Sequence, residues 1–246
     1  KYLKVHENNI NEGNLFLENL FPPYVLKADG LAAGKGVLII NNLNEAKIEL
    51  KRMLVDKKFG EASKNVVIEE FLDGIELSCF VLTDGKNYIN LPMAKDYKKI
   101  GEGDIGLNTG GMGAISPVPF VSKVFKNKID KEIIKPTIKG LYKEKIPFRG
   151  FLFIGLIKVK DKPKVIEYNV RMGDPETEVV LPRIKNDFGE ILISLVTNKL
   201  KFVKMEFSND SAATIVSVSQ GYPEKYEKGK EIKGLEKNTE SIIFHC

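Results

Sequence analysis

The stretch KVIEYNVRMGDPE, from Lys164 to Glu176, gives the most direct indication of the fold. Its alternating pattern predicts a strand, on which Glu167 and Asn169 lie on the same face. Both side chains offer oxygen atoms, the ligands that Mg²⁺ prefers when ATP phosphates supply the others. Arg171 is in phase with them, and a guanidinium group suits a phosphoryl oxygen. A plain strand with a polar outer face is the alternative interpretation, but the Gly-Asp-Pro-Glu that follows directly favours a metal and phosphate site.

Hairpin signals around this stretch indicate the fold class. Residues 151–160 and 164–170 predict two strands around a turn, and residues 75–82 and 87–91 flank an Asp-Gly pair, which strongly favours a hairpin. Hairpins mixed with separate helices predict an α+β fold with mostly antiparallel sheets, not a doubly wound parallel sheet. Further strands are expected at residues 24–28, 37–40, 66–70 and 212–219, and helices at 42–58, 122–142 and in two short segments after residue 175.

A second motif, KADGLAAGKG from Lys27 to Gly36, predicts a phosphate-binding loop. A strand ends near Lys27, small residues follow, and Lys35 comes directly after Gly34. Small residues let backbone N–H groups approach a phosphate closely, and two lysines add positive charge. An exposed glycine-rich hairpin is the alternative. The spacing does not match the GxxxxGK[ST] pattern of a Walker loop, so the usual P-loop fold is disfavoured.

Two further stretches need their context to be interpreted. EEFLDGIE, from Glu69 to Glu76, predicts a strand end whose connector could bind an adenine edge, with Glu76 accepting from ribose hydroxyls; solvated acidic residues are the alternative. GEGDIG at 101–106 matches GxGxxG, but the glycines after it cannot open a helix, so a dinucleotide site is disfavoured. We expect the whole glycine-rich stretch 101–113 to be a flexible loop that contacts substrate.

The composition is that of an ordinary globular protein. The chain has 246 residues, of which 43% are hydrophobic and 29% charged, so intrinsic disorder is excluded. Its apolar runs are far shorter than the roughly 20 residues that cross a bilayer, and we expect no membrane partner. The net charge of +5 is a weak hint of anionic ligands. It comes without the aromatic and basic stripe of a nucleic-acid binder, so no nucleic-acid partner is expected.

Cysteine and histidine are scarce in this chain. Cys79 lies in an apolar run, Cys246 is the last residue, and His6 and His245 lie near the two ends. These positions make neither a zinc pattern nor a disulfide framework, and they disfavour a histidine-based triad. A reducing, cytoplasmic location is therefore expected.

Taken in order, the motifs resemble those of the ATP-grasp superfamily and, in detail, those of the phosphoribosylamine–glycine ligase family. The detailed matches are KADGLAAGKG, NTGGMG at 108–113, NVRMGDPE at 169–176 and GYP at 221–223. The resemblance implies an ATP-grasp fold with a small α+β lid at residues 1–72 and a larger antiparallel core with the magnesium site at 73–209. Residues 210–246 would begin a C-terminal domain that is cut short, and the family's N-terminal domain would be absent.

The resemblance also implies an activity. Members of the family join glycine to 5-phosphoribosylamine through glycyl phosphate and release glycinamide ribonucleotide, ADP and phosphate, the second step of de novo purine biosynthesis. ATP and Mg²⁺ or Mn²⁺ would be the cofactors, the partners would be these small substrates, and the complete protein would be a monomer. Another ATP-grasp carboxylate–amine ligase and a non-catalytic nucleotide-binding module are the alternatives.

Roles can be transferred from the family to the matching positions. The implied catalytic residues are Arg171, Asp174 and Asp96, and the implied metal ligands are Glu167 and Asn169. Tyr97 stands where the family usually has His. The implied nucleotide- and substrate-binding residues are Lys27, Gly34, Lys35, Glu69, Glu70, Phe71, Leu72, Glu76, Asn108, Thr109, Gly110, Gly111 and Met112.

Overall fold

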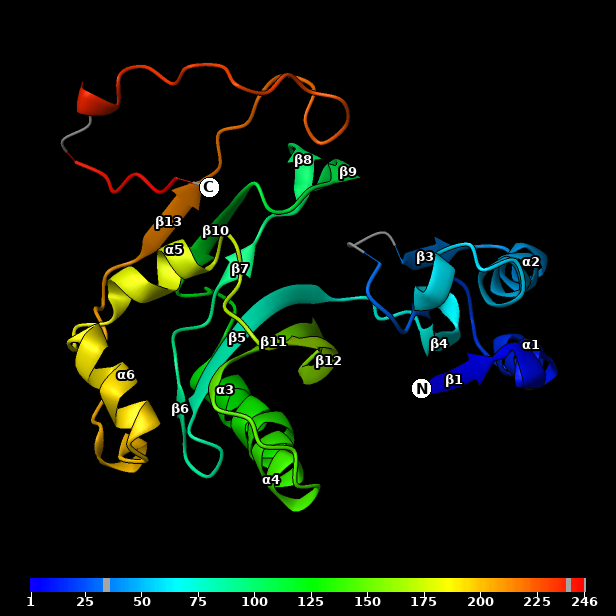
Figure 1. The fold of residues 1–246 in the computed structure, drawn as a ribbon, viewed down its shortest axis with the longest axis horizontal. Helices are drawn as coiled ribbons and strands as arrows, with labels where there is room; N and C mark the ends of the chain where they lie inside the picture. The colour runs from blue at the N-terminus through cyan, green and yellow to red at the C-terminus, as the bar shows by residue number, and fades with distance from the viewer. Residues whose placement is uncertain (33–35, 238–239, 246) are drawn as a thin grey trace. The chain divides into compact units, whose positions relative to one another are not determined.

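The computed structural model describes residues 1–32, 36–237 and 240–245, and the chain divides into two compact units at residues 1–73 and 74–246 (Figure 1). The predicted Gly34 and Lys35 lie outside the described residues. No helix in the described ranges is long and apolar enough to cross a membrane.

The first unit is a four-stranded antiparallel sheet with two helices on one face. The strand order is β1 (Tyr2–His6), β4 (Asn65–Glu70), β2 (Tyr24–Ala28), β3 (Val37–Ile40). The helices are α1 (Ile10–Glu18) and α2 (Leu43–Leu54), with short 3₁₀ turns η1 (Glu7–Asn9) and η2 (Gly60–Ser63).

The helix α2 forms because its sequence supplies both a capping residue at the start and apolar residues along the buried face. The Asn42 side chain caps it by accepting from the Glu45 amide at 3.1 Å. Its apolar residues pack with Val5, Leu26 and Ile68 of the sheet in one core. Alternate strand residues point to the other face, where Val37 and Ile39 of β3 are exposed. The first unit therefore has one buried sheet face and one open face.

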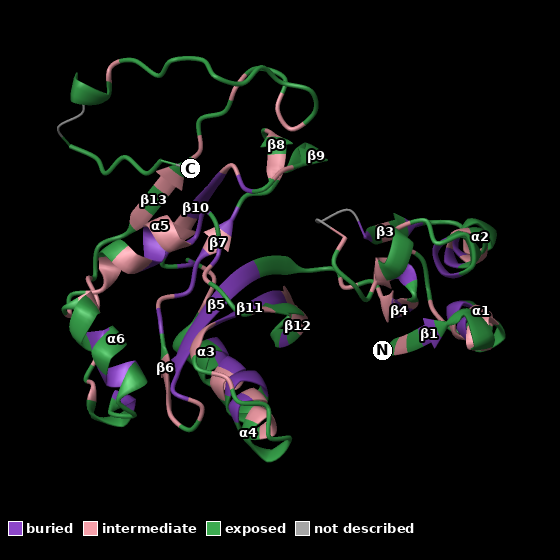
Figure 2. Ribbon diagram, viewed as in Figure 1, coloured by how far each residue is buried: buried purple, intermediate pink, exposed green. Residues whose placement is uncertain are grey.

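The second unit is built on a longer antiparallel sheet. Its order is β12 (Lys162–Asn169), β11 (Gly150–Val159), β5 (Ile75–Thr83), β6 (Tyr88–Asn90). One continuous helical segment packs against this sheet: α3 (Lys123–Ile129), a π-helical turn η3 (Asp130–Ile134) and α4 (Lys135–Lys143). β5 and β11 are buried along most of their length (Figure 2). Residues of these two strands enter more than one core cluster, so the sheet is covered on both faces.

Shorter elements complete the second unit. The strands β7 (Lys95–Asp96), β10 (Gly113–Ser116) and β13 (Ala212–Ile215) form a small sheet, and β8 (Lys99–Gly101) pairs with β9 (Ile105–Asn108). The helices are α5 (Thr177–Val180) and α6 (Phe188–Val196), with 3₁₀ turns η4 (Leu181–Arg183), η5 (Leu200–Phe202) and η6 (Leu235–Lys237).

All the strand pairings of the described residues are antiparallel, which confirms the predicted α+β class. The structure adds β1 and α1, which the sequence patterns did not indicate. It also places the hairpin β8–β9 inside the predicted glycine-rich loop. The strand β8 leads into GEGDIG, and a second strand rather than a helix follows it, which does not fit a dinucleotide site.

The segment around residue 210 is bonded to the second unit. β13 pairs with β10, and the Arg183 guanidinium donates to the carbonyls of Ser208 at 3.0 Å and Asp210 at 2.9 Å. Residues 74–246 thus form one compact unit, and a domain that begins at residue 210 stays a prediction.

Candidate active site

On the sheet face that α1 and α2 do not cover, Lys27 forms an ion pair with Glu69. In the register of β2 and β4, Lys27 lies opposite Val67 and Glu69 opposite Val25, so the two charged side chains are diagonal neighbours on one face. The Lys27 ammonium lies 2.7 Å from a Glu69 carboxylate oxygen, and both side chains are mostly buried. The predicted phosphate-binding lysine is therefore held by a carboxylate at the sheet surface.

The loop of small residues that follows β2 begins and ends in fixed positions. The Ala28 amide donates to the Gly36 carbonyl at 2.8 Å, and the Gly30 amide to the Ala62 carbonyl at 2.9 Å. Gly30 is required here, because a Cβ at this position would lie 2.5 Å from the Ala62 Cα. After β4, the Phe71 side chain is 40% exposed and so is available for contact with a ligand.

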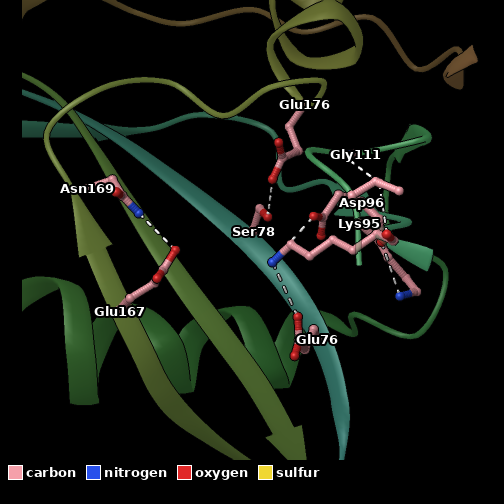
Figure 3. Close-up of polar contacts among 10 residues, drawn as sticks. Glu76, Ser78, Lys95, Asp96, Gly111, Glu167, Asn169 and Glu176 are labelled. Carbon is pink, nitrogen blue, oxygen red and sulfur yellow. Dashed lines mark hydrogen bonds and ion pairs between the residues drawn. The ribbon is translucent and has the colours of Figure 1, made fainter. Parts of the chain in front are cut away.

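In the second unit, Glu167 and Asn169 lie together near the end of β12, as the strand pattern predicted (Figure 3). The Asn169 amide nitrogen donates to one Glu167 oxygen at 3.0 Å, which leaves the Asn169 carbonyl oxygen and the second Glu167 oxygen for other contacts. Among the described residues there is no group of three or more acidic, His or Cys side chains that could hold a metal. One carboxylate and one amide oxygen fit Mg²⁺ or Mn²⁺, which retain water and phosphate ligands in such sites.

Lys98 lies at the centre of a charged cluster that the sequence patterns did not single out. Its ammonium is 3.5 Å from a carboxylate oxygen of both Glu76 and Asp96. Burial lowers the pKa of Lys98, but the negative charges of Asp96, Glu76, Glu167 and Glu176 outweigh this effect and raise the pKa overall. These five residues are called the Lys98 cluster below. Of the predicted site residues, Glu76 and Asp96 thus contact one cation directly, and Glu167 acts on it through its charge without an ion pair.

Glu176 is the most buried member of the Lys98 cluster, at 3% exposure. One of its oxygens accepts from the Ser78 hydroxyl at 2.6 Å (Figure 3). Gly173 leaves room for the carboxyl group, because a Cβ there would lie 2.4 Å from the other oxygen. Burial raises the pKa of Glu176, the Ser78 hydrogen bond lowers it and the Asp96 charge raises it, so the pKa is raised overall.

The segment Asn108–Met112, called the glycine loop below, makes close contacts with neighbouring segments. The amide and hydroxyl of Thr109 both donate to the Lys98 carbonyl at 2.8 Å. Gly111 has a φ of +140°, and a Cβ there would lie 2.3 Å from the Pro175 Cδ. The backbone of the loop therefore packs directly against the Gly-Asp-Pro-Glu segment.

Two of the predicted catalytic residues, Arg171 and Asp174, are not ion-paired with the Lys98 cluster. The Arg171 guanidinium donates to the neighbouring Met172 carbonyl at 2.8 Å, and Asp174 is exposed. Neither forms an ion pair with a described member of the Lys98 cluster. The sequence motifs gave no functional role to Lys98, Glu176 or Ser78. The signal for Ser78 was present, since it is a polar residue within the apolar run of β5.

The antiparallel sheets, the loop of small residues after a lysine-bearing strand and the Glu-x-Asn pair define an ATP-grasp domain. Residues 2–177 match the family described as "Phosphoribosylglycinamide synthetase, ATP-grasp (A) domain". The chain therefore belongs to the phosphoribosylglycinamide synthetase family. ATP-grasp ligases in general bind ATP together with divalent metal ions.

Named relatives agree with this family. The chain is 45% identical over 231 residues to the phosphoribosylamine–glycine ligase of Caldanaerobacter subterraneus subsp. tengcongensis, covering 94% of this chain and 55% of the relative. It is 47% identical over 222 residues to the enzyme of that name from Fusobacterium nucleatum, covering 90% of this chain and 52% of the relative.

A solved structure is also similar. The crystal structure of phosphoribosylamine–glycine ligase from Thermotoga maritima matches with a TM-score of 0.80 at 37% identity, covering 94% of this chain and 57% of that chain. The chain spans about half the length of the curated relatives it matches.

Proposed function

We propose that the protein containing this chain joins glycine to 5-phosphoribosylamine at the expense of ATP. The products would be glycinamide ribonucleotide, ADP and phosphate. The observation that carries this proposal is the Lys98 cluster, in which the Lys98 ammonium lies 3.5 Å from both Glu76 and Asp96 and its pKa is raised also by Glu167, the proposed metal-binding carboxylate. Its setting in a phosphoribosylglycinamide synthetase domain supports the choice of substrates.

The residues of the first unit would serve the nucleotide. Lys27 and Lys35 would bind phosphate oxygens. The Lys27 ammonium would then contact both Glu69 and the phosphate. The connector Glu70–Leu72 would line the adenine. In the second unit Glu76 would accept from the ribose hydroxyls.

The residues of the second unit would serve the metal and the acyl group. Glu167 and Asn169 would bind Mg²⁺ or Mn²⁺, which neutralises phosphate charge when it is bound. Arg171 would turn from the Met172 carbonyl to a phosphoryl oxygen. Asp96 and Asp174 would lie beside the reacting groups, and the glycine loop would face substrate.

The chemistry needs no nucleophile from the protein. The glycine carboxylate attacks the γ-phosphorus of ATP, the bond to ADP breaks, and the amine of the sugar then attacks the glycyl carbonyl and displaces phosphate. Burial raises the pKa of the Cys79 thiol to about 12, with a smaller contribution from the Asp130 charge, so this thiol is not a competing nucleophile. Positioning and charge neutralisation carry the reaction.

Phosphate release tests the proposal. The full-length gene product is assayed with ATP, Mg²⁺, glycine and freshly made phosphoribosylamine, and each component is left out in turn. Release should require both glycine and the amine. Glu167→Ala should lower the rate by about 100-fold or more, because it removes a ligand of the metal that neutralises the transferred phosphoryl group.

The matched control is Glu132→Ala, which removes an exposed carboxylate from the helical segment of the same unit and should leave the rate unchanged. Release that does not depend on glycine would overturn the substrate assignment. Equal rates for Glu167→Ala and Glu132→Ala would overturn the metal site.

A further inference from the structure

The GYP motif at residues 221–223 lies outside the matched family region, and none of its residues has a role in the proposed reaction. Its tyrosine nevertheless touches the glycine loop. The Gly110 amide donates to the Tyr222 hydroxyl oxygen at 3.0 Å, a contact between residues 112 positions apart. Further along the loop, the Met112 carbonyl accepts from the Val216 amide at 3.0 Å. The C-terminal segment therefore holds the glycine loop at two points.

The turn that presents Tyr222 is itself well defined. Gly221 has a φ of +95°, and a Cβ there would lie 2.6 Å from the Lys225 carbonyl oxygen, so glycine is required. The Tyr222 amide donates to the Ser219 carbonyl at 3.2 Å. The Tyr226 ring packs edge-on against the Tyr222 ring, with centroids 5.5 Å apart. These contacts fix the direction of the Tyr222 ring and hence of its hydroxyl group.

Every amide from Thr109 to Met112 has a protein acceptor. Thr109 donates to the Lys98 carbonyl, Gly110 to the Tyr222 hydroxyl, Gly111 to the Thr109 hydroxyl at 3.1 Å, and Met112 to the Tyr97 carbonyl at 2.8 Å. An amide has one hydrogen, so these four groups are not available to a phosphate. A carbonyl oxygen has two lone pairs and can accept from a ligand even when it is already bonded.

We propose that Tyr222 is a positioning residue that fixes the glycine loop so that its carbonyl oxygens accept hydrogen bonds from the amine substrate. This inference rests on the proposed function, because phosphoribosylamine is the substrate that carries both an amine and ribose hydroxyls. The Gly110 amide is the only one of the four that is bonded to a side chain of the C-terminal segment. The Tyr222 hydroxyl is therefore the side-chain contact of that segment with the loop, beside the backbone contact of Val216 with Met112.

The test compares two tyrosine variants in the full-length gene product. Tyr222→Phe removes the acceptor of the Gly110 amide and keeps the ring. Since one hydrogen bond is at stake, the KM for phosphoribosylamine should rise by about three- to tenfold, while the KM for ATP and kcat change by less than about twofold. Deuterium uptake by a peptide covering residues 108–113 should also become faster, because the Gly110 amide loses its acceptor.

Tyr226→Phe is the matched control, since it makes the same chemical change in the neighbouring ring, which packs against Tyr222. It should change neither the KM values nor the uptake. Identical behaviour of the two variants would overturn the positioning role, and so would a rise in the KM for ATP alone. If the wild-type protein released phosphate without glycine, the proposed function would fail, but the uptake comparison would still decide whether Tyr222 fixes the loop.

Discussion

Glu176 and Lys98 show how one neighbourhood shifts the pKa of an acid and of a base in the same direction. The Lys98 side chain is 47% exposed and lies among carboxylates, so its charged form is favoured. Glu176 is buried beside Asp96, so its charged form is disfavoured. Both pKa values rise overall: that of Glu176 mainly because burial disfavours its charged form, and that of Lys98 because the surrounding carboxylates outweigh the effect of burial. The negative charges of the cluster thus favour the charged form of Lys98.

The raised pKa of Glu176 predicts how stability depends on pH. The folded state binds more protons than the unfolded state from pH 4.5, the ordinary value, up to the raised pKa. Stability should therefore fall as pH rises through that window. Glu176→Gln removes the titration and can still accept from Ser78, so its melting temperature should rise relative to that of the wild type as pH increases from 4.5. The exposed Glu144→Gln is the control, and an equal pH profile for all three proteins would contradict the prediction.

At the scale of elements, the glycine-rich stretch is two structures with different needs. The hairpin β8–β9 turns through Gly103, which has a φ of +72°, and a Cβ at this position would meet no atom within 4 Å. The glycine loop that follows has Gly111 in contact with Pro175. Gly103 is therefore required by the backbone conformation alone, whereas Gly111 is required by both the backbone conformation and the packing against Pro175.

This difference can be measured with two alanine variants. Gly103→Ala should destabilise the second unit by about 1 kcal/mol, the cost of a left-handed backbone for an L-residue. Gly111→Ala adds the overlap with Pro175 to a backbone cost that is at least as large, because a φ of +140° lies outside the left-handed helical region, so it should destabilise by about 2 kcal/mol more. Urea denaturation followed by circular dichroism gives both values. A Gly111→Ala protein as stable as Gly103→Ala would show that Pro175 moves away without cost.

At the scale of the whole molecule, the chain has separate cores in its two units. Leu50 belongs to a cluster confined to residues 1–73, and Leu156 to a cluster confined to residues 74–246; both side chains are fully buried. The two cores share no side chain, so disrupting one of them removes no packing contact from the other. Stability in such a chain is not a single quantity.

Truncation of these two leucines tests the division. Leu50→Ala should destabilise the first unit by about 2 to 5 kcal/mol and Leu156→Ala the second by a similar amount. Hydrogen exchange read at peptides of β2 and β11 separates the two effects. Each variant should accelerate exchange in its own unit only, and equal acceleration in both units would show that they unfold together.

The sequence predicted those parts of the fold that local signals determine. The hairpins β5–β6 and β11–β12 follow from a turn between alternating strands, and the Glu167–Asn169 pair follows from the period of one strand. The pairing of β10 with β13 joins residues far apart in the chain, and no local pattern specifies it. The Lys98 cluster likewise takes residues from β5, β7, β12 and the turn before α5, so its centre could not be found until the sheets were in place.

The π-helical turn between α3 and α4 has a consequence for the evolution of chain length. Here the Lys135 amide donates to the Asp130 carbonyl, five residues back, so the turn contains one residue more than an α-helical turn. Ile133 and Ile134 of this turn are both buried. Deleting one residue at this turn would restore a regular α-helix while α3 and α4 keep the same faces toward the sheet. The turn is therefore the place where we expect this long helical segment to tolerate the loss of a residue without changing which faces of α3 and α4 meet the sheet.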